Sequence, residues 1–552
     1  YTALSYSWGA QRFDACIECD GHEKQITKSL EGALRQLRHP DHAVILWINQ
    51  ICINQRDNGE KEKQIPLMEH IYARSMNTVI WLGEGTAESD IAMGFLERIN
   101  KYLRFSFGNI SADEFETLGL PHKDSRAWVA LWDPLCRKWF TRVWVIQETL
   151  LPRGRTLWVA CGKSILLWDV LNHACIHLVE NGISLWMERL PITQYSRGVD
   201  VCRRSLDLAG SLSIFELLCR TRNAMCYDPR DKVYRLLGVC RESERATVKV
   251  SYADNCTAAT LYRDLAARFI GDQPHRVGTG LAYADHDSTE LPSWVPDWTA
   301  NSRAILLAAS WGQGIYSACG GWGGNLLHDL DARDRGQLCV KGLLVDSIIR
   351  TSDIFAFPEI SYIDPDSTNI TLLDAISFTS LIKDYKLGEA SFTELWHTRV
   401  AGKNGNGLQK SPSDFAEILS LLLDETTGLS ETLPGQADSV KQTPPKGNGR
   451  LKLANLSRRK SGATFQEIRV AFKRALTNRR LGITKNERFG LFSQRARGGD
   501  GIYVFEDCTA TYIMVPAQDN SLRFVGKCYV YGIMQGEGLK GDGNSMGNII
   551  IV

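Results

Sequence analysis

Two apolar runs with a helical stretch between them constrain the fold of the first part of this chain. Val44–Ile53 and Asn77–Gly83 are rich in β-branched and aromatic residues, which is typical of strands buried on both faces of a parallel sheet. After a polar turn at Asn54–Gly59, apolar residues recur at helical spacing up to Met76. Pro66 fits this predicted helix only in its first turn. The succession predicts an α/β fold with right-handed crossovers.

The neighbouring segments continue the α/β pattern. Tyr1–Tyr6 is predicted to be a strand, Ser29–Leu37 a short helix, and about Ser89–Lys138 a helical insertion. Trp139–Leu151 is predicted to be one helix with Thr141 as its N-cap. Two of its residues, Trp144 and Glu148, are four apart and therefore share a helical face.

The rest of the chain divides by composition and pattern. We predict an α/β domain at 1–165, a mainly helical region at 166–290, a mixed α/β region at 291–424 and a β-rich region at 464–552. Residues 425–463 are rich in Pro, Gly, Ser and Lys, which predicts a flexible linker or disordered loop. The predicted C-terminal strands are Ile502–Phe505, Thr511–Val515, Phe524–Ile533 and Asn548–Val552.

Charge and cysteine usage narrow the class of protein. Lys and Arg number 64 against 63 Asp and Glu, so we expect neither a nucleic-acid partner nor a membrane partner. The 15 cysteines are dispersed and odd in number, which favours reduced thiols in a cytoplasmic protein. The chain begins at Tyr1 within a predicted strand, so we expect its natural start, with any targeting signal, to lie upstream.

Four blocks of sequence occur in the order of a known family. They are Tyr1–Gly9 (YTALSYSWG), Leu46–Gln55 (LWINQICINQ), Val79–Gly83 (VIWLG) and Trp139–Glu148 (WFTRVWVIQE). Together they resemble the heterokaryon-incompatibility (HET) domain, which implies a soluble fungal intracellular protein. One departure is Asn49, where the family usually has Asp.

Three later stretches are similar to segments that follow HET domains in many fungal proteins. They are Asp228–Tyr234, Leu291–Trp298 and the terminal stretch from Val525 to Glu537. Taken by its residues alone, Asp228-Pro-Arg-Asp is a helix-start signal, and Asp297 indicates turn chemistry.

HET domains distantly resemble TIR domains, which have a flavodoxin-like fold with a parallel sheet. Some TIR domains hydrolyse NAD through one Glu on a helix that begins near an aromatic residue. Trp144-Val-Ile-Gln-Glu148 has that spacing. The resemblance therefore implies Glu148 as the catalytic carboxylate of an NAD glycohydrolase and Trp144 as its helical neighbour. NAD would then be a substrate, and neither a cofactor nor a metal is expected.

The chemistry of such a site can be stated from the residues. Cleavage of the N-glycosidic bond leaves an oxocarbenium-like ribose, which a nearby carboxylate stabilises. Open α/β sheets bind ligands beyond the carboxyl ends of their strands. The residues expected to contact a substrate there are Ser5, Tyr6, Trp8, Asn49 and Trp144, with Arg142 meeting a phosphate.

Structural interpretations stand beside these functional ones. Glu148 can instead pair with an Arg and fix the insertion against the sheet. Tryptophans such as Trp8, Trp81 and Trp144 can serve packing, because large aromatic side chains are usually buried. Asn54 and Gln55 are expected to form hydrogen bonds in a turn. A Glu148 open to a crevice would support chemistry, and a buried Glu148 paired to Arg would support a scaffold.

Three hypotheses about function follow. The first is a protein of vegetative incompatibility that recognises self and non-self and leads to cell death, with NAD hydrolysis as its enzymatic version. The second is a non-catalytic module that associates with itself or with an incompatibility partner. The third is a biosynthetic enzyme of fungal secondary metabolism, which would need a deep pocket away from Glu148.

Overall fold

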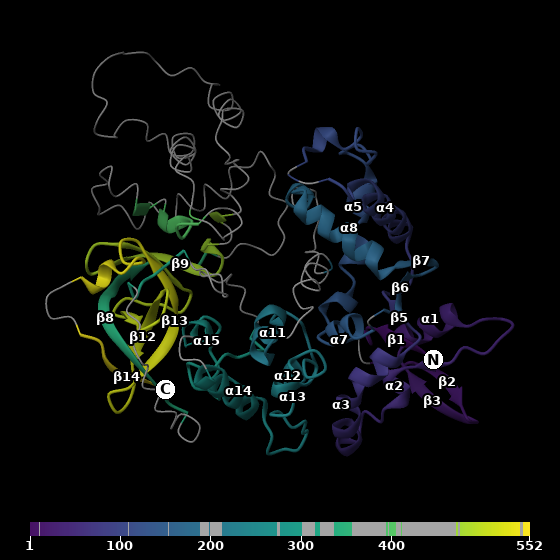
Figure 1. Cartoon of the computed structure of the whole chain (residues 1–552), viewed down its shortest axis with the longest axis horizontal. Helices are drawn as coiled ribbons and strands as arrows, with labels where there is room; N and C mark the ends of the chain where they lie inside the picture. The colour runs from purple at the N-terminus through teal and green to yellow at the C-terminus, as the bar shows by residue number, and fades with distance from the viewer. Residues whose placement is uncertain are drawn as a thin grey trace, which may run out of the picture. The chain divides into compact units, whose positions relative to one another are not determined.

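The computed structural model divides the chain into two compact units, drawn in Figure 1. The first is formed by Tyr1–Ala258 and the second by the described residues from Ala259 onward, and each is treated by itself. The structure describes residues 1–9, 12–106, 108, 110–152, 154–187, 198, 212–272, 277–300, 315–320, 336–355, 394–395, 397–403, 410, 471–472, 475–540 and 545–552. The predicted linker at 425–463 lies outside these residues.

A five-stranded sheet in the order β4-β1-β5-β6-β7 organises the first unit. Strands β4, β1, β5 and β6 are parallel to one another, and β7 joins β6 in an antiparallel hairpin. This confirms the predicted mixed α/β class with a sheet that contains parallel strands. The strands are β1 (Thr2–Tyr6), β4 (Leu46–Trp47), β5 (Asn77–Trp81), β6 (Thr156–Cys161) and β7 (Ser164–Leu167).

Helices connect these strands, and a small hairpin lies beside the sheet. Between β5 and β6 the chain forms the predicted helical insertion, which begins with α4 (Ala87–Leu103). Thr86 caps α4 because its hydroxyl accepts the Ser89 amide at 3.0 Å and its own amide is bound by the Ser89 hydroxyl at 2.7 Å. The other elements up to the end of the insertion are β2 (Ala15–Cys19), β3 (His22–Ile26), α1 (Lys28–Leu37), α2 (Asn49–Cys52), α3 (Asn58–Arg74), η1 (Ala112–Glu114), α5 (Arg126–Ala130) and α6 (Trp132–Leu135).

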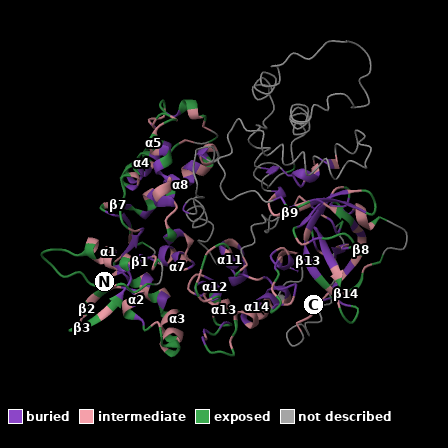
Figure 2. Ribbon diagram, turned by 180° about the vertical axis from the view of Figure 1, so that it is seen from behind, coloured by how far each residue is buried: buried purple, intermediate pink, exposed green. Residues whose placement is uncertain are grey.

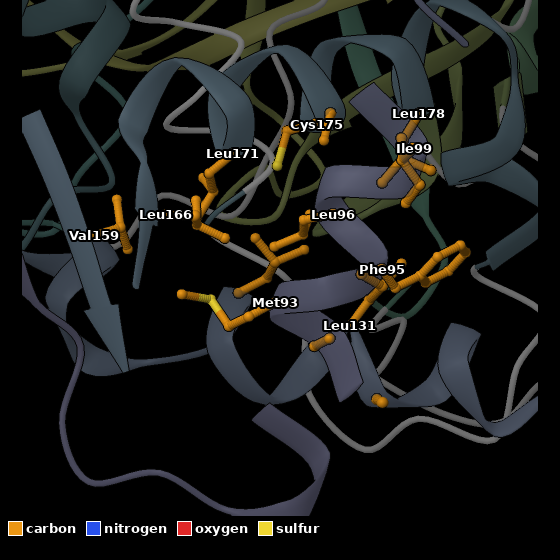
Figure 3. Packing of buried hydrophobic residues seen from close by; sticks show 14 of the residues in the cluster. Met93, Phe95, Leu96, Ile99, Leu131, Val159, Leu166, Leu171, Cys175 and Leu178 are labelled. Carbon is orange, nitrogen blue, oxygen red and sulfur yellow. The ribbon is translucent and has the colours of Figure 1, made fainter. Parts of the chain in front are cut away.

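The main apolar core of the first unit lies between the insertion and the sheet. Met93 and Leu96 on α4 face Leu171 on α8 (Trp168–Glu180), as Figure 3 shows. Val159 of β6 and Leu166 of β7 close the cluster from the sheet side. Burial of this many apolar side chains is the dominant favourable contribution to folding of this part of the chain.

The prediction of one long strand at Val44–Ile53 was wrong. Only Leu46–Trp47 pairs, as β4 at the edge of the sheet, and Ile45 is 73% exposed. From Asn49 the chain turns into the one-turn helix α2. An edge strand has one neighbour and cannot bury a run of this length, and an apolar run alone does not distinguish a strand from a buried helix.

Two predicted helix starts also differ from the structure. Asp57 caps α3 by accepting the Glu60 amide at 3.1 Å, so Pro66 lies in the interior of this helix, not in its first turn. The segment predicted as one helix from Trp139 is a 3-10 turn, η2 (Lys138–Thr141), followed by α7 (Val145–Leu150) with Trp144 at the N-cap position. Thr141 is therefore not the cap, because the chain between the two helices is extended and pairs with Met225.

The described residues that follow α8 in the first unit are mainly helical. Arg230 donates its backbone N–H to Asp228 at 2.9 Å one residue before α12 begins, which confirms the helix-start signal. The helices here are α9 (Ile183–Met187), α11 (Ile214–Thr221), α12 (Asp231–Tyr234) and α13 (Glu242–Arg245).

The second unit is built on seven strands that surround an apolar interior. Six of them form a closed ring in the order β10-β9-β8-β11-β12-β13, because β10 pairs with β13. β14 adds to β8 and touches β13. Buried residues gather on the ring strands, drawn purple in Figure 2. The elements are α14 (Ala258–Asp272), α15 (Val277–Leu281), β8 (Leu338–Thr351), β9 (Arg479–Thr484), β10 (Phe489–Ser493), β11 (Gly501–Phe505), β12 (Thr511–Pro516), β13 (Leu522–Val530), η4 (Glu537–Leu539) and β14 (Gly547–Ile551).

The Leu291–Trp298 stretch is an anchor of this ring. Trp294 and Trp298 are fully buried, and the Ser293 hydroxyl accepts the Phe524 amide of β13 at 2.9 Å. The Thr299 amide donates to Asp297 at 2.8 Å, which confirms the predicted turn chemistry.

All fourteen cysteines of the described residues are free thiols. No helix in the described part of the chain is long and apolar enough to cross a membrane.

Candidate functional site

Ser5 and Glu148 meet in the interior of the first unit. Ser5 lies near the carboxyl end of β1, and Glu148 lies on α7. The Ser5 hydroxyl donates to Glu148 Oε2 at 2.5 Å, while the indole N–H of Trp139 donates to Ser5 Oγ at 2.7 Å. All three side chains are buried, and Glu148 has an exposed fraction of 0%. The Ser5 hydroxyl therefore connects the sheet to both η2 and α7.

Arg142 completes this cluster by binding Glu148 with both arms of its guanidinium. Nη1 donates to Oε2 and Nη2 donates to Oε1, each at 3.0 Å. Burial lowers the pKa of Arg142, but the charge of Glu148 and its hydrogen bonds outweigh burial and hold the pKa above its usual value. Both carboxylate oxygens are thus occupied, and the pair resembles the planar two-point contact that Arg makes with carboxylates.

Two tyrosines border the ion pair. The Tyr6 hydroxyl donates to Gln50 Oε1 at 2.8 Å, and Tyr72 on α3 is completely buried. Burial raises the pKa of Tyr6, and burial followed by the charge of Glu148 raises the pKa of Tyr72. Both hydroxyls therefore stay protonated at neutral pH and cannot act as bases there.

The other predicted contact residues form a separate group. Alternate residues of a strand leave from opposite faces, so Ser5 and Tyr6 point to different sides of β1. Beyond the strand end, the Trp8 indole donates to Asn49 Oδ1 at 3.3 Å. The Gln55 side chain donates to the Asn49 carbonyl at 3.0 Å, which confirms its predicted turn role. The structure therefore brings together Ser5, Arg142 and Glu148, and separately Trp8 and Asn49.

Trp144 has a packing role in this arrangement. It stands at the N-cap of α7, and the Glu148 amide donates to its carbonyl at 3.2 Å. Its ring packs against a small apolar cluster that includes Ala3, Met68 and Tyr72. The predicted four-residue relation of Trp144 and Glu148 is thus present, but the Trp144 indole is hydrogen-bonded to Asp231, whereas Glu148 binds Ser5 and Arg142.

Sequence reasoning missed three members of the cluster. Trp139 and Gln50 lie within the sequence blocks identified above and Tyr72 lies between two of them, yet nothing in their spacing relates them to Ser5. The one usable signal was a polar side chain, Gln50, inside an otherwise apolar run. Gln50 and Trp139 reach β1 by side-chain hydrogen bonds between residues 44 and 134 positions apart.

An open groove lies elsewhere in the first unit. It runs along α1 and the loop that follows, and the rings of His39 and His42 stack within it at 3.6 Å between centroids. None of the predicted site residues lines this groove. Among the described residues, no three His, Cys, Asp or Glu side chains are placed to hold a metal ion.

Comparisons with known proteins agree with this architecture. Residues 1–148 match the heterokaryon incompatibility protein (HET) family, and residues 431–542 match the Het-6 β-barrel domain. We call residues 1–148 the HET domain after this match. Its HET domain contains Ser5 and Arg142 and ends, by this match, at Glu148. The closed strand ring of the second unit includes β8, which precedes the matched barrel range.

A curated fungal relative supports the same family. The chain is 27% identical over 371 residues to heterokaryon incompatibility protein 6, OR allele, of Neurospora crassa. The alignment covers 54% of this chain and 53% of the relative, so the chain spans about half the length of the curated protein it matches. No solved structure matches the chain.

Proposed function

We propose that this HET-domain protein acts in fungal heterokaryon incompatibility, in recognition of self and non-self that leads to cell death. Two matched domains and the name of the Neurospora relative support the biological role. Within that role, we propose that the HET domain is a signalling and interaction module that associates with itself or with an incompatibility partner. Its Glu148 is a structural group.

The observation that carries the structural role is the closure of Glu148. Its carboxylate has no exposed surface, and Arg142 and Ser5 occupy its oxygens at 2.5–3.0 Å. A nucleophile or an ion-stabilising carboxylate must face the reacting sugar, whereas this carboxylate faces its own protein partners. The Ser5 hydroxyl ties Glu148 of α7 to β1, which suits a module that transmits a conformational signal.

NAD hydrolysis is the second candidate function. Its support is the position of Ser5 and Glu148 near the carboxyl end of a parallel strand, where open α/β sheets bind ligands. In this version Arg142 swings away from Glu148 to meet a phosphate of NAD, and the freed carboxylate stabilises the ribose oxocarbenium ion. The biosynthetic hypothesis stays a prediction.

Expression in a fungal host distinguishes the two versions. The chain, its Glu148→Gln variant and the control Glu97→Gln, at an exposed position of α4, are induced to equal levels. Growth and total NAD are then measured. The module proposal expects arrested growth with NAD unchanged at the onset of arrest. NAD loss that disappears only in Glu148→Gln, in cells where this variant stays folded by limited proteolysis, would establish the enzymatic version instead. Normal growth with all three, even beside an incompatible partner strain, would overturn the incompatibility role.

A further inference from the structure

A segment that follows the HET domain in sequence returns to its helices. We call residues 222–253 the strap. At its start, the Val143 amide donates to the Met225 carbonyl at 3.0 Å, and the Met225 amide donates to the Thr141 carbonyl at 2.6 Å. These two bonds form a bridge across Arg142. The strap therefore holds the backbone of the residue whose side chain closes Glu148.

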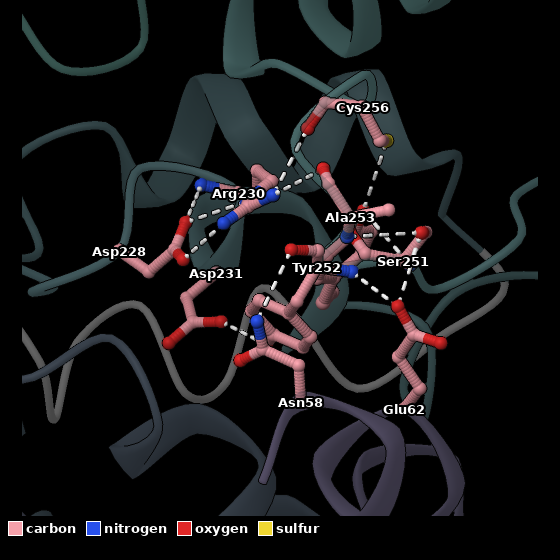
Figure 4. Close-up of polar contacts among 10 residues, drawn as sticks. Asn58, Glu62, Asp228, Arg230, Asp231, Ser251, Tyr252, Ala253 and Cys256 are labelled. Carbon is pink, nitrogen blue, oxygen red and sulfur yellow. Dashed lines mark hydrogen bonds and ion pairs between the residues drawn. The ribbon is translucent and has the colours of Figure 1, made fainter. Parts of the chain in front are cut away.

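The far end of the strap binds α3. Glu62 Oε1 accepts the Ser251 hydroxyl at 3.0 Å and the Tyr252 amide at 2.5 Å. Asn58 donates to the Tyr252 carbonyl at 3.4 Å, and the Lys61 ammonium lies 4.6 Å from the centre of the Tyr252 ring. Figure 4 shows Asn58 and Glu62 of α3 pointing toward Tyr252 and Ser251 of the strap. Because α3 binds both the amide and the carbonyl of Tyr252, this end of the strap is held through its backbone.

Internal bonds keep the strap in shape between its two ends. The Tyr252 hydroxyl donates to Asp231 at 2.5 Å. Arg230 binds both oxygens of Asp228 at 2.8–3.0 Å and also reaches the carbonyl of Ala253 at 3.2 Å (Figure 4). These groups connect α12 to the end of the strap that binds α3.

The middle of the strap touches both helices of the site. Arg245 forms an ion pair with Glu69 of α3. A Cβ at Gly238 would lie 2.8 Å from Gln147 Nε2 of α7 and 3.2 Å from Glu69 Cβ, so only glycine fits this approach without displacement of its neighbours. The strap thus follows the surface formed by α3 and α7.

The strap is held to the HET domain mainly by polar contacts. The contacts described above between the strap and the HET domain are hydrogen bonds and an ion pair, while the strap's own apolar residues, such as Val233 and Leu236, are buried. Within the described residues, the three apolar clusters around the HET sheet contain no strap residue. Met225 and Tyr227 remain 54% and 88% exposed. Release of the strap would therefore break polar contacts without removing a member of these three clusters.

We propose that the strap is an autoinhibitory clamp that keeps the Arg142–Glu148 pair closed. Detachment of Met225 frees the backbone of residues 141–143, loosens Arg142 and exposes the surface of α3 and α7. This inference rests on the proposed function only in what release achieves, namely the signalling form of the HET domain. The closure itself is a property of the molecule that can be measured without any cell.

Charge reversal of one ion pair tests the clamp. In the full chain, Glu69→Arg and Arg245→Glu are made singly and together, and hydrogen exchange is followed in peptides that cover 139–151 and 222–231. Each single variant is expected to speed exchange in both peptides by roughly fivefold or more, and the double variant to return to near the wild-type rate. Faster exchange at 222–231 with an unchanged 139–151 would overturn the clamp, and so would unchanged exchange in both.

Two further measurements separate failure of the clamp from other failures. Tyr252→Phe removes only the hydroxyl that binds Asp231, so it is expected to give a smaller increase at both peptides without global unfolding. Its failure to change either peptide would count against transmission through the strap. Growth of cells that express the single variants is scored in parallel. Faster exchange without earlier arrest would leave the clamp standing and overturn the proposed function.

Discussion

Removal of the Glu148 charge is predicted to destabilise the HET domain strongly. Glu148→Gln keeps the shape and one acceptor oxygen, but it turns an NH₂ group toward a guanidinium that can only donate. Arg142 and Glu148 have side-chain exposed fractions of 15% and 1%, so little solvent replaces the lost bond. Breaking a buried pair by removing one partner costs about 3–5 kcal/mol.

A double-mutant cycle isolates the interaction. Glu148→Gln, Arg142→Met and the double variant are unfolded with urea, followed by circular dichroism, and compared with Glu97→Gln as the exposed control. Because the chain has two compact units, the quantity compared is the midpoint of the transition that Glu148→Gln moves, provided its slope is unchanged. The double variant is expected to cost about 1–3 kcal/mol less than the sum of the single variants.

One result would refute the reasoning. If Glu148→Gln changed stability by less than about 1 kcal/mol, or raised it, Glu148 would not hold α7 to the sheet. A stabilising change is typical of strained functional groups, whose removal relieves the fold at the expense of activity. The structural role would then give way to the catalytic one.

Two further predictions test a glycine contact and a buried acid. Gly162→Ala is expected to destabilise the first unit by about 3 kcal/mol or more, because its Cβ would lie 2.5 Å from the Gly85 Cα. Gly154→Ala is the control: Gly154 also has a positive φ, but a Cβ there would meet open space, so the substitution is expected to cost only about 1–2 kcal/mol. Thermal melts of the two variants measure both costs. Burial raises the pKa of Asp231 from 3.8 to about 6, against the opposing hydrogen bond from Tyr252. The protonated Asp231 side chain therefore contributes fully to stability below about pH 4, and this contribution is lost as the pH rises through 6. Over that interval the free energy of unfolding of the wild type should fall by about 3 kcal/mol relative to that of Asp231→Asn. Parallel profiles of unfolding free energy against pH for the two proteins would contradict this.

Local sequence patterns predicted the elements whose partners are close in the chain or whose burial is two-sided. Asn77–Trp81 is a central strand with neighbours on both sides, and its apolar run was recognisable. The run at Val44–Ile53 is similarly apolar, but it lies at the edge of the sheet and only Leu46–Trp47 pairs there. The edge position depends on the order of strands, which an apolar run does not encode.

The sequence also predicted one part of the candidate site and not another. The four-residue spacing of Trp144 and Glu148 predicted a shared helical turn, and α7 has it. The start of that helix was not predictable from Thr141, because a bridge to Met225 keeps the intervening chain extended. Backbone pairing across some eighty residues overrode the local capping preference.

The sequence by itself indicated an α/β domain that resembles the HET family and a β-rich C-terminal region, because ordered motifs and hydrophobic periodicity are properties of neighbouring residues. It also named Glu148 and Arg142 as residues of interest. Only the tertiary structure decided that they bind each other. Ser5 reaches Glu148 across 143 positions, and the carboxylate is shielded from solvent by segments from three parts of the HET domain. Burial and charge pairing depend on this convergence, and they decide whether a carboxylate holds a fold together or faces a substrate.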